Sequence, residues 1–272
     1  MQATIDDRRV GYDAAGSGVP LLLLHAFPLN RTMYAEQAEG LRDIARVIAF
    51  DAPGVSRSEP GPLSIDGLAD LAVGLLDALQ IPRAVVGGVS MGGYVALSFA
   101  RRHPDRLLGL ILANTRAAAD SEEARKGRAE TAQVARKQGP GAIAEQMLPK
   151  VLGPTALKRN RKLVSRVRAM IEGVPGEVIA DLLAALAGRA DSTPSLGAIS
   201  VPTLVIASED DTVTPAAEAR QWAQEIPESR YVEIPGVGHL SNLEAPTEFN
   251  QAIRTFLETA ILFHDGSVAA AR

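Results

Sequence analysis

Hydrophobic residues along the chain form short continuous runs separated by longer stretches in which they recur every three or four positions. A first pair of short runs, Ala3–Ile5 and Arg9–Tyr12, predicts an opening hairpin. The runs that follow are near-continuous in Leu, Val, Ile and Ala, which is typical of parallel strands covered by helices on both faces. They predict buried strands at Pro20–His25, Arg46–Asp51, Ala84–Val89, Leu107–Ala113, Pro202–Ala207 and Arg230–Ile234.

The stretches between these runs have the periodicity of amphipathic helices. Ser64 is suited to cap one of them, and Pro215 fits the first turn of another. Alternation of strands and helices predicts an α/β fold with a mostly parallel central sheet. The predicted helices are Thr32–Ala45, Ser64–Leu79, Met91–Arg102, Ala216–Glu225 and Thr247–Thr259.

This alternation stops after Asn114. Residues 117–188 show only helical periodicity, interrupted by Gly and Pro, and predict a helical cap inserted into a core of residues 1–116 and 189–260. The last residues, 261–272, are expected to form a disordered tail. No Phe, Tyr or Trp occurs between Phe99 and Trp222, so a cap surface that faces a pocket must be aliphatic or polar.

Composition and charge fit one globular domain that carries an insertion. The 272 residues include 46% hydrophobic and 22% charged residues, and the net charge of −4 gives no reason to expect nucleic acid as a partner. The charge is unevenly distributed, because Thr115–Gly197 contains 14 Lys and Arg but 9 Asp and Glu. This difference also sets the middle segment apart from its flanks.

Several classes of site and location are disfavoured. The chain has no cysteine, and its four histidines show no His-x-x-x-His spacing, so we expect neither a metal nor another cofactor. The longest apolar runs, such as Val19–Leu24, are too short to cross a membrane, and the polar N-terminus does not resemble a signal peptide. We therefore expect a cytoplasmic protein without a membrane partner. Nothing in the sequence indicates its oligomeric state.

The segment Gly88-Val89-Ser90-Met91-Gly92 has the pattern G-x-S-x-G between a predicted strand and a predicted helix. A serine on so sharp a turn is held in a strained conformation, and its neighbours must be small for the helix to pack close by. The alternative is an ordinary turn that is rich in small residues. The strand–turn–helix context favours Ser90 as a nucleophile.

A serine nucleophile requires a nearby base, and His239 is the best candidate. It lies in a glycine-rich loop after the last predicted strand, where a side chain can face a pocket. His25 ends a strand and His103 ends a helix, so structural roles are favoured for both, and His264 lies in the expected tail.

The histidine in turn needs a carboxylate to hold its tautomer. Glu209, Asp210 and Asp211 follow the strand Pro202–Ala207, and this loop gives the chain order serine, acid, histidine. The end of the strand Leu107–Ala113 is another place for an acid, but Asn114 stands there. The later loop is therefore preferred.

Acyl transfer also requires hydrogen-bond donors aimed at the developing oxyanion. The backbone N–H of Met91, directly after the nucleophile, is one candidate. The backbone N–H of Phe27, in the loop after Pro20–His25, is the other.

Together these segments resemble the α/β-hydrolase superfamily over nearly the whole chain. Within it the sequence is similar to capped esterases and lactonases, a group that includes 3-oxoadipate enol-lactonases, non-haem chloroperoxidases and carboxylesterases. The segments that carry the resemblance are His25–Pro28, Asp51–Ser58, Gly88–Gly92, Val201–Pro215 and Gly236–Pro246.

The resemblance implies that Asp211 is the acid, because it stands four residues before Pro215, as the acid does in similar hydrolases. It also implies hydrolysis of a small ester or lactone through an acyl-enzyme on Ser90. Two alternatives are a carbon–carbon bond hydrolase of ring-fission products and a non-catalytic ligand receptor on the same scaffold. The chain departs from the usual pattern at Ala26 and Ser56, where glycine is common. A methyl group at Ala26 is expected to restrict the oxyanion loop.

Overall fold

A computed structural model of the chain describes residues 1–261. Its strands form one sheet in the order β1-β2-β4-β3-β5-β6-β7-β8. The β1–β2 and β2–β4 pairs are antiparallel, and all other neighbouring strands are parallel. The mostly parallel α/β sheet predicted from the sequence is confirmed. Its strands are β1 (Gln2–Ile5), β2 (Arg8–Ala15), β3 (Val19–Leu24), β4 (Ala45–Phe50), β5 (Ala84–Val89), β6 (Leu107–Ala113), β7 (Thr203–Ser208) and β8 (Ser229–Ile234).

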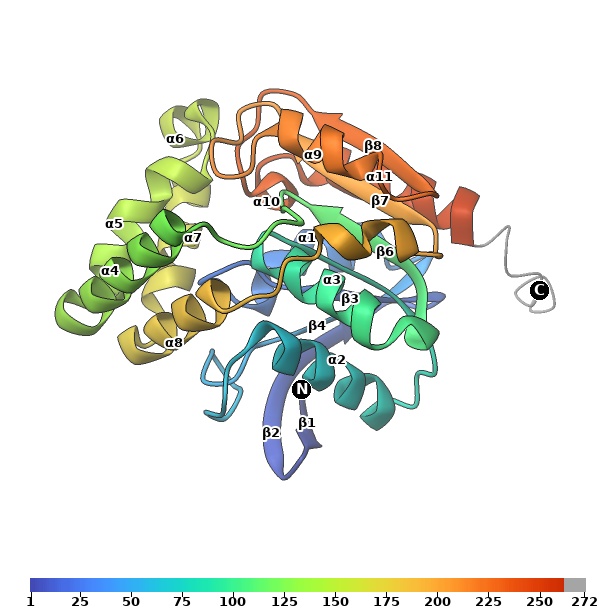
Figure 1. Cartoon of the computed structure of the whole chain (residues 1–272), viewed down its shortest axis with the longest axis horizontal. Helices are drawn as coiled ribbons and strands as arrows, with labels where there is room; N and C mark the ends of the chain where they lie inside the picture. Colours follow the sequence, from blue (N-terminus) through green and yellow to red (C-terminus); the bar gives the residue numbers. More distant parts are fainter. Residues whose placement is uncertain (262–272) are drawn as a thin grey trace.

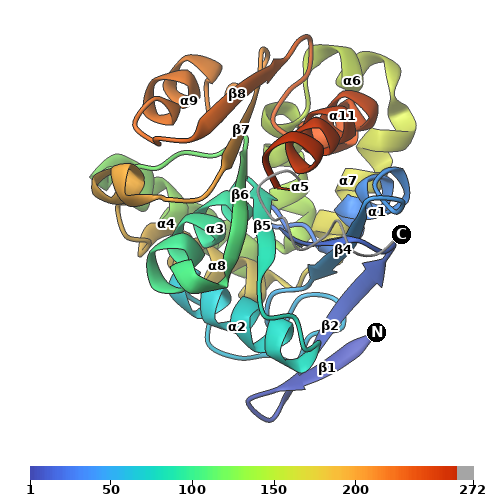
Figure 2. The same ribbon diagram turned by 90° about the vertical axis from the view of Figure 1, so that its right-hand side faces the viewer.

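Helices cover both faces of the sheet (Figure 2). On one side lie α2 (Ile65–Ala78), α3 (Met91–Arg102) and α9 (Ala216–Ala223), and on the other lie α1 (Ala35–Gly40) and α11 (Pro246–Phe256). Every residue of β5 and of β7 is buried. This two-sided burial explains why these strands read as continuous apolar runs rather than as alternating patterns.

One helix prediction differs clearly from the structure. In place of one helix over Thr32–Ala45, the chain forms a 3₁₀ turn, η1 (Arg31–Tyr34), and the short α1, which ends at Gly40. Glycine is a poor helix former, and Leu41 beyond it is fully buried in the core. At the end of the described chain, α11 gives way to the π-helical turn η4 (Leu257–Ile261).

Ile261, which we expected to begin the disordered tail, is helical and only 5% exposed. Its Cδ1 lies beside Gly109, where a β-carbon would be 2.7 Å from it. The ordered chain therefore extends at least one residue further than expected. Residues 262–272 lie outside the described residues.

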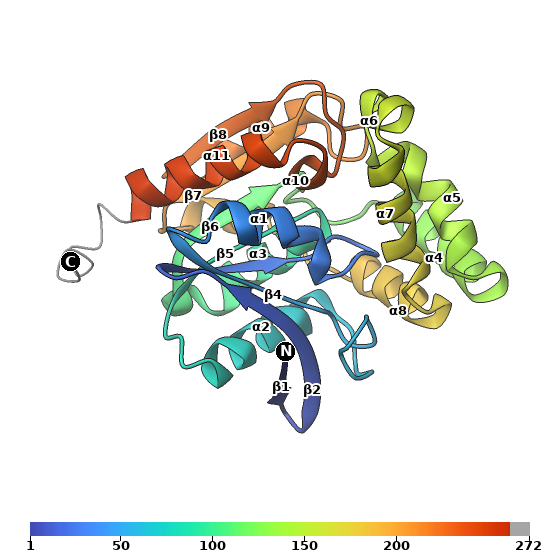
Figure 3. The ribbon, with the colours of Figure 1, turned by 180° about the vertical axis from the view of Figure 1, so that it is seen from behind.

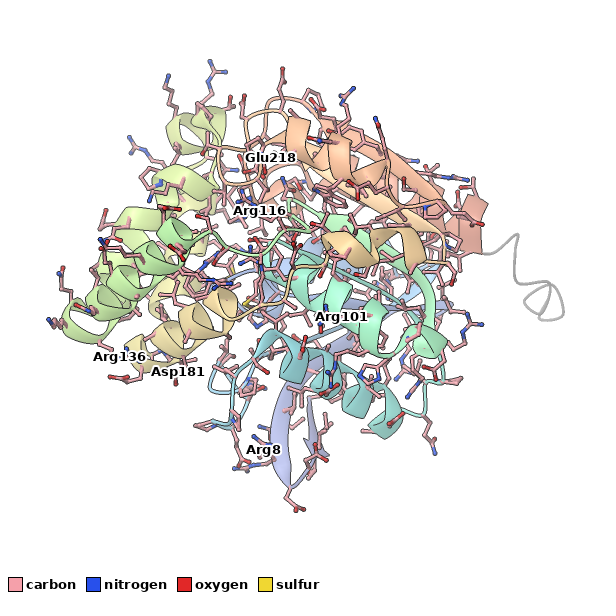
Figure 4. The ribbon with its side chains drawn as sticks, viewed as in Figure 1. Arg8, Arg101, Arg116, Arg136, Asp181 and Glu218 are labelled. Atoms are coloured by element: carbon pink, nitrogen blue, oxygen red, sulfur yellow. The ribbon has the colours of Figure 1, made fainter. Side chains whose placement is uncertain are left out.

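The segment 117–188 contains five helices and no strand. These helices gather at one end of the sheet (Figures 1 and 3). Two of them, α4 and α8, are joined by Arg136, which pairs with Glu177 at 3.0 Å and with Asp181 at 3.5 Å (Figure 4). The five are α4 (Glu122–Gln138), α5 (Pro140–Val151), α6 (Pro154–Arg159), α7 (Arg161–Glu172) and α8 (Gly176–Ala187).

The two chain segments that connect these helices to the sheet are clasped together. Buried Arg189, which follows α8, donates to Asp120 at 2.7 Å and to the Ala118 carbonyl at 3.0 Å. The Ser192 N–H donates to the Ala117 carbonyl at 2.9 Å. Arg128 on α4 also pairs with Asp120, so one buried carboxylate serves two guanidinium groups.

Residues 1–261 contain neither a membrane-spanning helix nor a cluster of metal ligands. No helix there is both long and apolar enough to span a membrane. No group of three or more His, Cys, Asp or Glu side chains in that range is arranged to hold a metal ion.

Candidate active site

Ser90 lies on the turn between β5 and α3 with φ 57° and ψ −115°. A positive φ is rarely adopted by residues other than glycine, so this backbone is strained. The turn is held from both sides: the Ser90 N–H donates to the Ala113 carbonyl at 2.9 Å, and the Thr115 hydroxyl donates to the Ser90 carbonyl at 2.8 Å. The local geometry is therefore the sharp strand-to-helix turn that the G-x-S-x-G pattern predicts.

The glycines around Ser90 permit this turn. A β-carbon on Gly92 would lie 1.9 Å from the Leu24 carbonyl oxygen, and one on Gly88 would lie 2.5 Å from the same atom. Both distances are far below van der Waals contact. The backbone of α3 therefore packs directly against the end of β3, which brings Ser90 beside the loop that follows β3.

His239 lies in the loop after β8, and its Nδ1 donates to Oδ2 of Asp211 at 2.8 Å. Both residues are buried, with 2% and 5% of their surfaces exposed. The N–H groups of Val213 and Thr214 donate to Asp211 Oδ1 at 2.8 and 2.9 Å. Because the carboxylate accepts from Nδ1, it leaves Nε2 of His239 free to act as a base.

Burial alone would raise the pKa of Asp211. The hydrogen bonds that it accepts from His239 and from Thr214, together with the charge of His239, outweigh burial and hold this pKa well below its usual range. Asp211 therefore remains ionised beside the imidazole. A carboxylate at this position orients the imidazole and holds its tautomer.

The other candidates from the sequence lie elsewhere. Glu209 is exposed and accepts the Gly236 N–H at 2.9 Å, and no hydrogen bond joins Asp210 to His239 in the described chain. His25 is buried, with Nδ1 bonded to the Ala26 carbonyl and Nε2 bonded to the Ala52 N–H. His103 pairs with Asp70, and His264 lies outside the described residues.

Asn114 is a site residue whose role the sequence did not reveal. Its Nδ2 donates to Oδ2 of Asp211 and to the hydroxyl of Ser208, both at 2.9 Å. Its Oδ1 accepts a hydrogen bond from Ser241 at 2.5 Å. The only indication in the sequence was its position directly after β6, where an acid was considered. The structure shows that Asn114 does not take the place of the carboxylate but donates a hydrogen bond to it.

A cavity of about 340 Å³ brings the candidate residues together. Ser90, His239, Phe27 and Met91 all line it. Within residues 1–261, the N–H groups of Phe27 and Met91 have no acceptor, and no hydrogen bond joins the Ser90 hydroxyl to His239. Hydrogen bonds between a nucleophile and its base commonly tighten when substrate binds.

The cap side of this cavity is aliphatic and polar, as the lack of aromatic residues predicts. The aromatic residues of the lining, Phe27 and Tyr94, precede the cap in the chain. Arg128 and Lys150 also contribute, and no Asp or Glu of the described chain lines the cavity. The cap residues are Ala124, Gly127, Arg128, Thr131, Gln146, Met147, Lys150, Val151, Leu183 and Leu186.

The two departures from the glycine pattern have different consequences. Ala26 is not among the residues with positive φ, so its methyl group imposes no backbone strain. Ser56 does have a positive φ of 51°, in the region that favours glycine. Its hydroxyl accepts a hydrogen bond from Arg31 at 3.3 Å, which holds it in this conformation.

Comparison with known proteins identifies relatives along nearly the whole chain. The profile of the alpha/beta hydrolase family matches residues 21–252. The 3-oxoadipate enol-lactonase 2 of Acinetobacter baylyi is 32% identical over 88% of each chain. A thermophilic esterase from Thermogutta terrifontis, solved with malate bound, has a TM-score of 0.92 and 39% identity, covering 96% of this chain and 98% of its own. The enol-lactonase of Burkholderia xenovorans has a TM-score of 0.88 and 30% identity, covering 95% and 100%.

Proposed function

Because the chain belongs to the alpha/beta hydrolase family, we propose that it hydrolyses small carboxylic esters or lactones through an acyl-enzyme on Ser90. One observation carries this proposal. Ser90, His239 and the backbone N–H groups of Phe27 and Met91, which have no acceptor within residues 1–261, belong to the lining of one cavity. His239 is in turn hydrogen-bonded to Asp211. Esterases and enol-lactonases among the relatives support the same class of substrate.

In the proposed mechanism His239 Nε2 takes the proton from Ser90 as Oγ attacks the substrate carbonyl carbon. The Phe27 and Met91 N–H groups stabilise the oxyanion of the tetrahedral intermediate. When the carbon–oxygen bond to the leaving group breaks, His239 gives its proton to that oxygen. Water then attacks the acyl group by the same route and releases the acid and free Ser90.

The charges of the cavity indicate which of these substrates the site prefers. Arg128 and Lys150 line it, and no described carboxylate does so. Arg128 shares Asp120 with Arg189, which leaves this cluster with a net positive charge. We propose that esters or lactones with a second, free carboxylate are favoured over neutral ones of equal length.

A panel of p-nitrophenyl esters and simple lactones tests this function. We expect release of p-nitrophenol from short acyl esters, and kcat/KM about tenfold higher for the anionic p-nitrophenyl hemiglutarate than for neutral p-nitrophenyl pentanoate. Lys150→Gln should lower that ratio, whereas Lys126→Gln on the solvent side of α4 should not. Turnover of a vinylogous diketone without any ester hydrolysis would contradict the proposal, and so would ligand binding without turnover.

A further inference from the structure

Glu244 closes the short helix α10 (Ser241–Glu244) and is half-buried behind the histidine loop. Its Oε1 accepts the N–H of Gly238, the residue before His239, at 3.1 Å. Its Oε2 accepts the N–H of Gly153, between α5 and α6, at 2.9 Å. One carboxylate therefore bridges the backbone of the histidine loop and the backbone of the cap.

The two backbones that Glu244 joins are also in direct contact. A β-carbon on Gly238 would lie 2.4 Å from the Gly153 nitrogen, and one on Gly153 would lie 2.8 Å from the Gly238 nitrogen. The Leu240 N–H donates to the Val151 carbonyl at 3.2 Å. The end of α5 and the histidine loop therefore form one hydrogen-bonded junction. Gly238 and Leu240, the two neighbours of His239 in the chain, both take part in it.

We propose that Glu244 is a positioning residue, whose carboxylate fixes the His239 loop to the cap so that the placement of the cap determines the placement of the base. This inference rests on the proposed function, in which His239 is the base. Lys150 and Val151 at the end of α5 line the same cavity as His239. A substrate that contacts α5 therefore contacts a helix that is hydrogen-bonded to the loop of His239.

The burial and the hydrogen-bond donors of Glu244 are consistent with a specific role for this carboxylate in joining the loop and the cap. Burial raises the pKa of this carboxyl group, while the Gly153 and Gly238 N–H groups and the charge of His239 act in the opposite direction. A half-buried carboxylate without such donors would be costly. Nearby Glu209 offers a matched comparison, because it accepts the Gly236 N–H of the same loop but makes no hydrogen bond to the cap within residues 1–261.

The test compares Glu244→Ala and Glu244→Gln with the control Glu209→Gln. With p-nitrophenyl pentanoate we expect Glu244→Ala to lower kcat about a hundredfold with KM within about twofold, because a base displaced by about 1 Å loses transition-state stabilisation only. Glu244→Gln keeps one acceptor oxygen but sets an NH₂ group against the other N–H, and should lower kcat about tenfold. Glu209→Gln should retain the wild-type kcat.

Hydrogen exchange provides a readout that does not depend on activity. In Glu244→Ala the amides of Gly153 and Gly238 should exchange faster together, because both lose their acceptor. Exchange that accelerates at only one glycine, or a wild-type kcat in Glu244→Ala, would overturn the inference. An equal loss of kcat in Glu209→Gln would overturn it as well. If wild type hydrolyses no ester, the proposed function fails, and the exchange of the two amides still decides whether Glu244 joins loop and cap.

Discussion

At the scale of single residues, the site depends on how completely Asp211 is hydrogen-bonded. Its two oxygens accept from His239, Asn114, Val213 and both donors of Thr214. This network fixes the carboxylate in one orientation and leaves it no freedom to turn from the imidazole. Chain order and position before Pro215 pointed to this residue, but the side chains of Asn114 and His239 reach it from distant segments that no local pattern relates.

Replacing Asp211 should therefore affect catalysis far more than replacing its neighbour. Asp211→Asn should lower kcat by about three to four orders of magnitude, because the amide no longer holds the imidazole tautomer. Asp210→Asn should cost about tenfold or less. Steady-state rates of both variants at one pH test the assignment, and the reverse ranking would refute it.

Asn114 should matter for both stability and rate. Asn114→Ala leaves Asp211 Oδ2 and the buried Ser241 hydroxyl each with one partner fewer. We expect a loss of about 1–3 kcal/mol in the free energy of unfolding and a kcat about tenfold lower. Denaturant titration and kinetics measure the two effects, and wild-type values for both would show that Asn114 does not support the acid.

At the scale of elements, predictions were accurate where local and tertiary requirements coincide. The bounds of β5, β6 and α3 agree with the sequence analysis, because apolar runs, a glycine turn and a helical pattern meet at Ser90. The predicted helix Thr32–Ala45 is wrong beyond Gly40, because burial of Leu41 and the start of β4 at Ala45 override helical periodicity. Residues 117–120 and 189–192 carried no pattern that revealed the hydrogen bonds between them.

The turn at Ser90 should tolerate no side chain at Gly92. Gly92→Ala would place a methyl group 1.9 Å from the Leu24 carbonyl, so α3 must move away from β3. We expect a loss of at least about 3 kcal/mol in the free energy of unfolding, or failure to fold. Gly127→Ala on α4 is the control, because nothing lies within 4 Å of its β-carbon and alanine should stabilise the helix by about 0.5–1 kcal/mol. Equal stability of the two variants would contradict the packing argument.

At the scale of the whole molecule, a mostly parallel sheet carries a helical segment whose ends are clasped by buried charges. We propose that residues 117–188 act as a cap that selects substrates, while residues 1–116 and 189–260 form the catalytic core. Arg116 adds a second tie, because it donates to the Val213 carbonyl at 2.6 Å and lies 3.8 Å from Glu218 (Figure 4). The entry to the cap is thereby joined to the loop of Asp211.

The clasp should show a specific pH dependence. Burial alone would raise the pKa of Asp120, but its pairs with Arg128 and Arg189 outweigh burial and lower it. A carboxyl group with a lowered pKa in the folded state stabilises the protein above about pH 4, and this contribution is lost as pH falls through the folded-state pKa. Asp120→Asn should therefore lower the melting temperature by about 5–15 °C at pH 7, and by less as the pH falls below about 4. A difference that is constant with pH would argue against the charged clasp.

Covalent labelling with a fluorophosphonate, followed by peptide mass mapping, tests the assignment of Ser90 as nucleophile most directly. The account predicts one label, on the peptide that contains Ser90, with loss of ester hydrolysis in proportion to labelling. Ser90→Ala should fold, remain unlabelled and turn over at least about a thousandfold more slowly. A label on another residue, or wild-type turnover by Ser90→Ala, would contradict it.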